Sequence, residues 1–254
     1  MRVVACFDVS PEPQDIQVRP DRTLDLGRAK PKIGAYALHA IEAACVLAAA
    51  AGGEAVGLTA GELATVGNPK LRKDALSRGL DRLVAVAVPD AADLDSFQTA
   101  SVLAAALAQM GQVDLVLAGA GSSGQYSQQV GNQLGALLGW PTLNAVNSVA
   151  LGEQPAASVV VERLLEGAAQ VAEVTLPAVL TLTSGINVPR IAGMRDILAA
   201  GKKPVEELEL TPPPAAATIL SVLAPPAADR ARVLIEADAA TAAARLAEYL
   251  REPS

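Results

Sequence analysis

The chain contains the apolar stretch Val113-Asp-Leu-Val-Leu-Ala118, followed directly by Gly119-Ala-Gly-Ser-Ser-Gly-Gln-Tyr-Ser-Gln-Gln-Val-Gly131. The first segment is typical of a buried strand, and residues 133–138 after the glycines are typical of a helix. A glycine-rich turn between a strand and a helix exposes backbone N–H groups that can bind an anion. The stretch therefore predicts an α/β fold with a nucleotide phosphate held at residues 119–131.

Strands and helices alternate on the amino-terminal side of this stretch. The pattern predicts strands at 2–7, 55–59 and 83–88, helices at 35–51, 69–78 and 96–110, and a small hairpin formed by 16–19 and 23–26. Such alternation predicts a parallel sheet with helices on both faces and right-handed crossovers.

The pattern changes in the carboxyl-terminal part of the chain. The expected elements are a hairpin at 158–165 and 169–176, a strand at 178–183, a loop and short helix at 189–203, and a terminal helix at 238–251. Residues 211–226 are rich in Pro and Ala and predict an extended connector. A single helix beyond it cannot bury its own apolar face, so it must pack on the domain or on a partner. We therefore divide the chain into an α/β domain at 1–210 and an arm at 211–254.

Composition excludes several classes of protein. The 254 residues carry a net charge of -7 and only 2% aromatic residues, whereas nucleic-acid binding calls for a basic face and stacking aromatics. Cys6 and Cys45 are too few for a disulfide framework and fit a reduced, intracellular setting. The amino terminus lacks signal-peptide features, and the apolar helix at 40–51 is too short to span a bilayer. We expect a soluble, cytoplasmic protein without nucleic-acid partners or direct membrane insertion.

Catalytic and metal-binding constellations are not apparent. His39 is the only histidine and lies within a predicted helix, where a structural role is favoured over general-base chemistry. One histidine and two cysteines give no transition-metal site. Ser122, Ser123 and Ser127 have no nucleophile-elbow context, so they are better interpreted as hydroxyl donors to a phosphate or as a helix N-cap. We predict no catalytic residue and no metal.

The glycine stretch also differs from two common nucleotide loops. No Gly-Lys-Ser/Thr follows it, which excludes a Walker motif. It comes after the fourth strand of the alternating series, whereas a Rossmann dinucleotide loop follows the first.

A second unusual segment runs from Asn187-Val-Pro-Arg190 to Gly201-Lys-Lys203. One interpretation is a surface helix whose basic last turn is favoured by the helix dipole. The other is a docking element with Met194 as an adaptable apolar anchor.

Taken in order, segments along nearly the whole chain resemble the β subunit of electron transfer flavoproteins. They are Val3-Val-Ala5, Val18-Arg-Pro-Asp-Arg-Thr23, Ala40-Ile-Glu-Ala43, Arg78-Gly-Leu-Asp-Arg82, Val113-Asp-Leu-Val-Leu117, Gln129-Val-Gly131, Val161-Glu-Arg163, Glu166-Gly167, Leu176-Pro-Ala-Val-Leu-Thr181, Asn187-Val-Pro-Arg190 and Ala199-Ala-Gly-Lys-Lys203. Their order and spacing, more than any one of them, carry the resemblance.

The resemblance implies a doubly wound, mostly parallel sheet of the adenine nucleotide α-hydrolase-like class, with an added β-hairpin and a carboxyl-terminal arm packed on an α subunit. It implies an electron carrier, redox-active only with that α subunit, which holds most of an FAD. Electrons would pass from a flavin dehydrogenase to a quinone-linked oxidoreductase. The β subunit usually holds an AMP, and electron-bifurcating relatives hold a second FAD there.

The resemblance also implies two sets of site residues. The nucleotide set is Ala5, Ala60, Gly61, Gly119, Gly121, Ser122, Ser123, Gly124, Gln125, Tyr126, Ser127, Gln128, Gln129, Val130 and Gly131. The partner-docking set is Arg190, Ile191, Met194, Ile197, Lys202 and Lys203. In the family a leucine in this segment docks on acyl-CoA and related dehydrogenases, and Met194 takes its place.

The nucleotide loop departs from the family pattern. Gly124-Gln-Tyr-Ser127 replaces the acids of AMP-binding relatives and the Asp-Gly-Asp-Thr of bifurcating ones, Asn132 replaces a proline, and Gly34 replaces an Asn. Backbone N–H groups with Ser127, Gln128 and Gln129 would then hold the nucleotide. We favour AMP, with FAD and an empty site as the alternatives.

Two further functions remain as alternatives. The first is a stand-alone adenine-nucleotide sensor of similar fold, which would need neither the hairpin at 158–176 nor the arm. The second is an adenylate-using enzyme, against which the lack of a Ser-Gly-Gly-type loop near the first strand argues.

Overall fold

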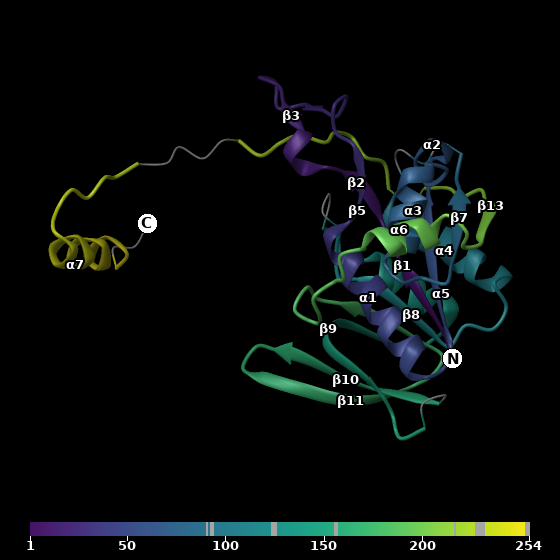
Figure 1. The fold of residues 1–254 in the computed structure, drawn as a ribbon. Helices are drawn as coiled ribbons and strands as arrows, with labels where there is room; N and C mark the ends of the chain where they lie inside the picture. Colours follow the sequence, from purple (N-terminus) through teal and green to yellow (C-terminus); the bar gives the residue numbers. More distant parts are fainter. Residues whose placement is uncertain are drawn as a thin grey trace.

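The computed structural model describes residues 1–89, 91, 94–122, 126–154, 157–215, 217–226 and 232–251. Within them lies a nine-stranded sheet in the order β11-β10-β9-β12-β8-β1-β6-β7-β13 (Figure 1). Its strands are β1 (Arg2–Cys6), β6 (Glu54–Gly61), β7 (Arg82–Ala87), β8 (Leu115–Gly119), β9 (Thr142–Leu151), β10 (Ser158–Leu165), β11 (Ala168–Thr175), β12 (Ala178–Leu182) and β13 (Val205–Glu209). The helices are α1 (Ala35–Ala50), α2 (Leu63–Val66), α3 (Pro69–Ser77), α4 (Ser96–Gln109), α5 (Val130–Leu138), α6 (Met194–Ala200) and α7 (Ala239–Tyr249).

The sheet is doubly wound. β1 pairs in parallel with β6 on one side and with β8 on the other. The chain first builds outward from β1 through β6 to β7, then crosses back to β8 and continues to β12. β9 and β13 extend this parallel sheet, and the antiparallel hairpin β10–β11 is added beyond β9. The predicted fold class, including the hairpin, is confirmed.

Helices cover both faces of the sheet. One apolar cluster joins α1 and α3 to alternate residues of the strands, such as Val3 and Leu117. The other joins α4 and α5 to the intervening residues, such as Val4 and Val116. Because successive side chains of a strand point to opposite faces, the central strands must be apolar throughout.

A smaller substructure interrupts the first crossover. It consists of two short antiparallel pairs, β2 (Val9–Pro11) with β5 (Pro31–Ile33) and β3 (Gln17–Val18) with β4 (Leu24–Asp25), and the 3-10 helix η1 (Pro13–Asp15). The hairpin predicted around Pro20-Asp21 is the β3–β4 pair.

Two strands of the main sheet were missing from the sequence prediction. β9 contains Asn144, Asn147 and Ser148, so it lacks the continuous apolar run of a buried strand. β13 reads Val-Glu-Glu-Leu-Glu and pairs only with β7, at the edge of the sheet. An edge strand needs few apolar residues, which explains why this charged segment gave no strand signal.

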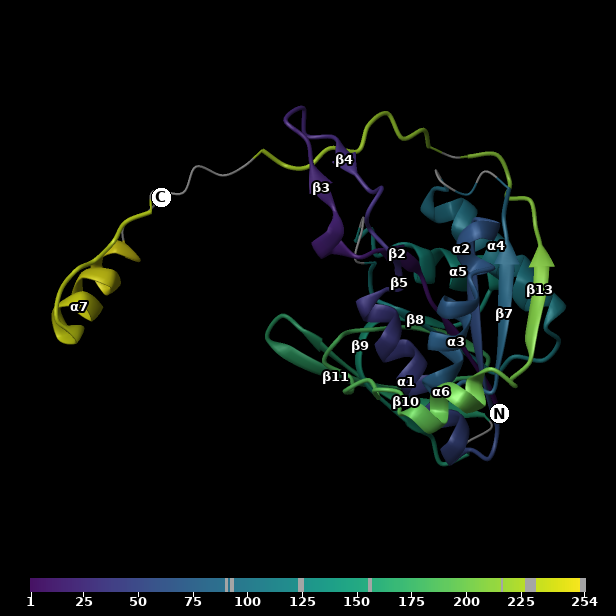
Figure 2. The same cartoon turned by 45° about the horizontal axis from the view of Figure 1, so that its top comes forward.

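The connector binds along the domain, whereas the terminal helix does not. Gln98 Nε2 donates to the Pro213 carbonyl at 2.9 Å, and the Ala224 N–H donates to the Arg22 carbonyl at 2.9 Å. Asp238 caps α7 by accepting from the N–H groups of Ala240 and Thr241. α7 has no buried residue, and both views place it away from the α/β domain (Figures 1 and 2). The terminal helix therefore does not pack on the α/β domain, which was one of the two surfaces expected to cover it.

In the part of the chain that the structure describes, no helix combines the length and apolar character needed to cross a membrane.

Candidate functional site

The carboxyl ends of β8, β1 and β6 lie side by side at one edge of the sheet. Because the chain winds away from β1 in one direction through β6 and in the other through β8, this edge is the topological switch point, where open α/β sheets bind ligands. Gly119 ends β8, and Ala60 and Gly61 end β6, so the topology brings these predicted residues to the same edge. Ala5 is fully buried within β1 and does not reach this edge. The residues at the edge are the ones that follow β1 in the chain.

Gly119 allows α1 to approach β8 closely. A Cβ atom at this position would lie 2.7 Å from Tyr36 Cβ and 3.0 Å from the Tyr36 carbonyl carbon, both in the first turn of α1. The Tyr36 ring lies beside the Tyr126 ring, with centroids 5.4 Å apart. A hydrogen bond with the Tyr126 side chain is the main reason that the pKa of Tyr36 is raised. The two tyrosines thus link α1 to the predicted nucleotide loop.

The amino-terminal end of α5 has no side-chain cap among the described residues. The helix starts at Val130, and Gln129 at its N-cap makes no side-chain capping bond. Gln129 Oε1 instead accepts from Ser96 Oγ at 2.7 Å, which leaves the amide Nε2 as an additional donor beside the helix end. N–H groups at such an end carry partial positive charge and suit a phosphate.

The rest of the predicted loop is only partly described. Ser122 Oγ accepts from the Tyr126 N–H at 3.3 Å, and Ser127 and Gln128 are exposed. Ser123, Gly124 and Gln125 lie outside the described residues.

Asp8, which follows β1, was missed by the sequence analysis. Its carbonyl accepts from the Gly34 N–H at 3.0 Å, and a Cβ atom at Gly34 would lie 2.2 Å from Asp8 Oδ1. The other carboxylate oxygen, Oδ2, is buried without a hydrogen-bond partner. Burial raises the pKa of Asp8, and a hydrogen bond from its own backbone N–H lowers it by less. The sequence feature that could have identified Asp8 is a carboxylate directly after a predicted buried strand.

The cysteines offer no nucleophile. Burial raises the pKa of Cys6 to about 12 and that of Cys45 to about 11, so both remain thiols at neutral pH. Among the described residues, no group of His, Cys, Asp and Glu side chains could hold a metal ion.

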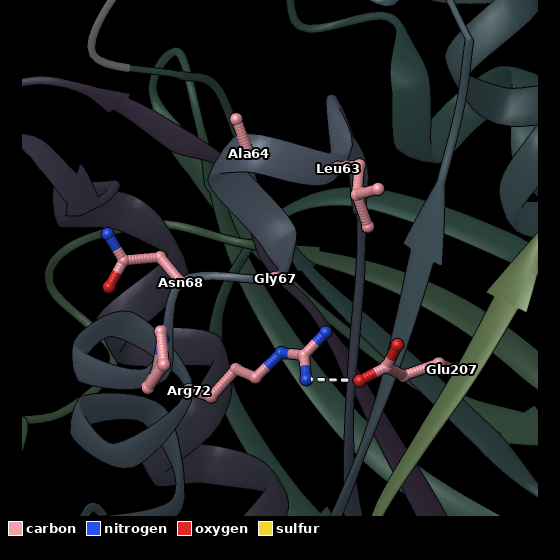
Figure 3. Close-up of a pocket in the computed structure, with 7 residues that line it drawn as sticks. Leu63, Ala64, Gly67, Asn68, Arg72 and Glu207 are labelled. Carbon is pink, nitrogen blue, oxygen red and sulfur yellow. Dashed lines mark hydrogen bonds and ion pairs between the residues drawn. The ribbon is translucent and has the colours of Figure 1, made fainter.

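A surface depression of about 420 Å³ lies elsewhere, beside α2 and β13 (Figure 3). Arg72 crosses it to form an ion pair with Glu207 at 2.5 Å, and its Nε donates to the Val66 carbonyl at 2.6 Å. Because Glu207 neutralises the guanidinium, this depression provides no net charge for a phosphate, and it shares no residue with the glycine loop.

The segment that begins at Asn187 is attached to α1 at two points. Asn187 Nδ2 donates to the His39 carbonyl at 3.0 Å, and His39 Nδ1 lies 3.1 Å from the Asn187 carbonyl oxygen. One turn further along α1, Glu42 accepts from Arg190 Nε at 2.7 Å and from Nη2 at 2.9 Å. His39 therefore has the structural role expected from its helical position.

The predicted docking residues separate into exposed and internally bonded side chains. Ile191 is 94% exposed and Met194 74%, and Lys202 is also exposed, whereas Ile197 is half-buried. Lys203 donates to the Leu76 and Leu80 carbonyls near the end of α3, and Arg190 is held by Glu42. The apolar side chains, more than these two cations, are available to a partner.

Replacing Gly131 with Ala should destabilise the protein, because the new methyl group would lie 2.2 Å from Thr181 Cγ2 on β12. We expect a loss of about 1–3 kcal/mol in the free energy of unfolding, measured with urea. Adding Thr181→Ser removes the obstructing methyl while keeping the hydroxyl that accepts from the Ala145 N–H, and should restore stability. A Gly131→Ala variant as stable as the parent would show that α5 does not depend on this contact.

Replacing Glu42 with Gln should cost about 1 kcal/mol at pH 7, because Arg190 is partly exposed. The Arg190 hydrogen bonds lower the pKa of Glu42 below its ordinary value of 4.5. The contribution of ionised Glu42 to folding stability is therefore complete above pH 4.5. It is lost as the pH falls through the lower pKa that Glu42 has in the folded protein. Urea unfolding at pH 7 and in steps below 4.5 should show the parent and the variant converging. Glu166→Gln, in the exposed β10–β11 turn, is the control, and a difference that persists at low pH would contradict this explanation.

Comparison with known families agrees with this geometry. A family model described as the electron transfer flavoprotein domain matches residues 23–213, well over half of the chain. The matched region includes α1, the glycine loop at the switch point, the hairpin β10–β11 and the segment around α6. The chain belongs to the electron transfer flavoprotein family.

Proposed function

We propose that this chain is the β subunit of a heterodimeric electron transfer flavoprotein. In this role it catalyses no bond-making and carries electrons only together with an α subunit. Electrons pass from a flavin dehydrogenase to a quinone-linked oxidoreductase. FAD, held mainly by the α subunit, supplies the redox chemistry when bound.

The observation that carries the subunit assignment is the carboxyl-terminal arm. Leu246 and Leu250 of α7 are exposed, and none of the helix is buried by the rest of the described chain. An isolated eleven-residue helix is marginal in water, so a partner surface must stabilise it. We assign residues 1–210 to the nucleotide-binding domain and 211–254 to an arm that packs on the α subunit, in a cytoplasmic complex.

We propose that the nucleotide at the switch point is AMP. The open end of α5 supplies N–H donors, Gln129 supplies its amide, and Gly119 allows the close approach that shapes the edge. The start of α1 also lacks a side-chain cap, but the Asp8 carboxylate lies against Gly34 there. Of these two long helices, α5 is therefore the one whose start suits an anion, which fits one phosphate better than a pyrophosphate. The FAD of a bifurcating relative is the alternative.

The exposed apolar side chains of the α6 segment support a docking role. Ile191, Met194 and Leu198 project from a segment whose start is fixed to α1 by Glu42. A rigidly held apolar patch loses little entropy on binding, which favours contact with a protein partner. We propose that this patch contacts the electron-donating dehydrogenase.

Co-expression with an α subunit of an electron transfer flavoprotein tests the subunit assignment. The full chain should yield a yellow heterodimer. A chain truncated after Pro226 keeps the described connector contacts but loses α7, so its association with the α subunit should weaken at least tenfold. Size-exclusion chromatography measures association with the α subunit, and absorbance at 450 nm measures the bound flavin. A colourless monomer that ignores the α-type protein would refute the proposal.

Met194→Glu should reduce electron transfer from the cognate dehydrogenase about tenfold or more without changing flavin content, because it places a charge in an apolar contact. Reduction of the heterodimer flavin by the dehydrogenase, followed by absorbance, measures the effect. Leu164→Glu, on the exposed end of β10, is the matched control. An equal loss of flavin would show that Met194 has a structural role instead.

A further inference from the structure

We propose that the carboxylate of Asp8 binds the ribose of the nucleotide and accepts hydrogen bonds from its hydroxyl groups. This inference rests on the proposed nucleotide site and adds one residue that contacts the sugar. The phosphate would lie at α5 and the sugar beside the end of β1.

The unpartnered oxygen of Asp8 indicates a missing donor. Four buried side-chain atoms lack a hydrogen-bond partner among the described residues: Asp8 Oδ2, Thr59 Oγ1, Arg78 Nε and Gln133 Oε1. Asp8 is the only carboxylate of the four, and none of the ion pairs found in the described residues includes it. A buried acceptor without a donor is costly, so a ligand that supplies a donor would be favoured there.

The position of Asp8 separates it from the phosphate. α5 begins against β12, where Gly131 contacts Thr181, and Asp8 follows β1; β8 lies between these two strands. Two strand spacings amount to about 10 Å within the sheet. Asp8 is therefore too far from the start of α5 to share the phosphate, and a group further along the nucleotide, such as a sugar hydroxyl, is the one that it would contact.

The charge of Asp8 favours the same orientation of the nucleotide. A carboxylate repels a phosphate, so Asp8 disfavours the reversed ligand. The carboxylate also lies against Gly34 at the start of α1, so it already occupies the space where an anion could approach that helix. Of the two long helices that start at this edge, α5 is then the one without a carboxylate against its first residue.

The test compares Asp8→Asn with the parent chain in calorimetric titrations with 5′-AMP, 2′,3′-dideoxy-AMP and purine riboside 5′-monophosphate. The parent should prefer AMP over dideoxy-AMP. Asp8→Asn loses the charge and keeps one neutral acceptor oxygen, so it should weaken AMP binding about tenfold and reduce that preference by a similar factor. Asp114→Asn removes a carboxylate at the opposite end of β8 and should leave all three affinities unchanged.

A melting curve without nucleotide checks that the variant folds. Because burial raises the pKa of Asp8, its ionisation weakens folding as pH rises above the ordinary value of 3.8. Asp8→Asn should therefore melt at or above the parent's temperature at pH 7.

The remaining outcomes separate the two proposals. If Asp8→Asn keeps the parent's preference for AMP over dideoxy-AMP, the sugar contact is wrong. If Asp8→Asn instead changes only the ratio of the affinities for AMP and purine riboside monophosphate, Asp8 contacts the base, and the inference is overturned. If the parent binds none of the three ligands, the proposed nucleotide site itself fails and this inference fails with it.

Discussion

Burial of the central strands on both faces is the constraint on which this structure depends. β1 and β8 pack between α1 on one face and α4 with α5 on the other, so their residues must be apolar in both directions. Polar groups can then appear only where these strands end. The same constraint requires Gly119 at the end of β8, because a larger residue would separate the strand from α1.

The two helices that reach this edge are not equivalent. Neither has a side-chain cap, but the Asp8 carboxylate lies against the start of α1. α1 also holds the segment that begins at Asn187, through His39 and Glu42. One helix therefore connects the proposed nucleotide site with the surface proposed to meet the dehydrogenase. A core element thus positions both parts of the proposed function.

Much of the domain follows from local sequence patterns, but the details of the site do not. Alternating apolar segments predicted β1, β6, β7, β8 and the hairpin β10–β11, whereas β13 was missed because its charged residues are tolerated at a sheet edge. Asp8, Tyr36 and Ser96 act through contacts with residues far away in the chain, which no local pattern encodes. Arg190 and Lys203 were predicted to dock a partner, and their bonds to Glu42 and to α3 become visible only in the fold.

In the proposed complex, the switch point holds a nucleotide within a flavin-carrying heterodimer. A mass-spectrometric count of the nucleotides released when the purified heterodimer is denatured tests this arrangement. We predict one FAD and one AMP per heterodimer. FAD alone would contradict the nucleotide site, and two FAD molecules would contradict its assignment to AMP.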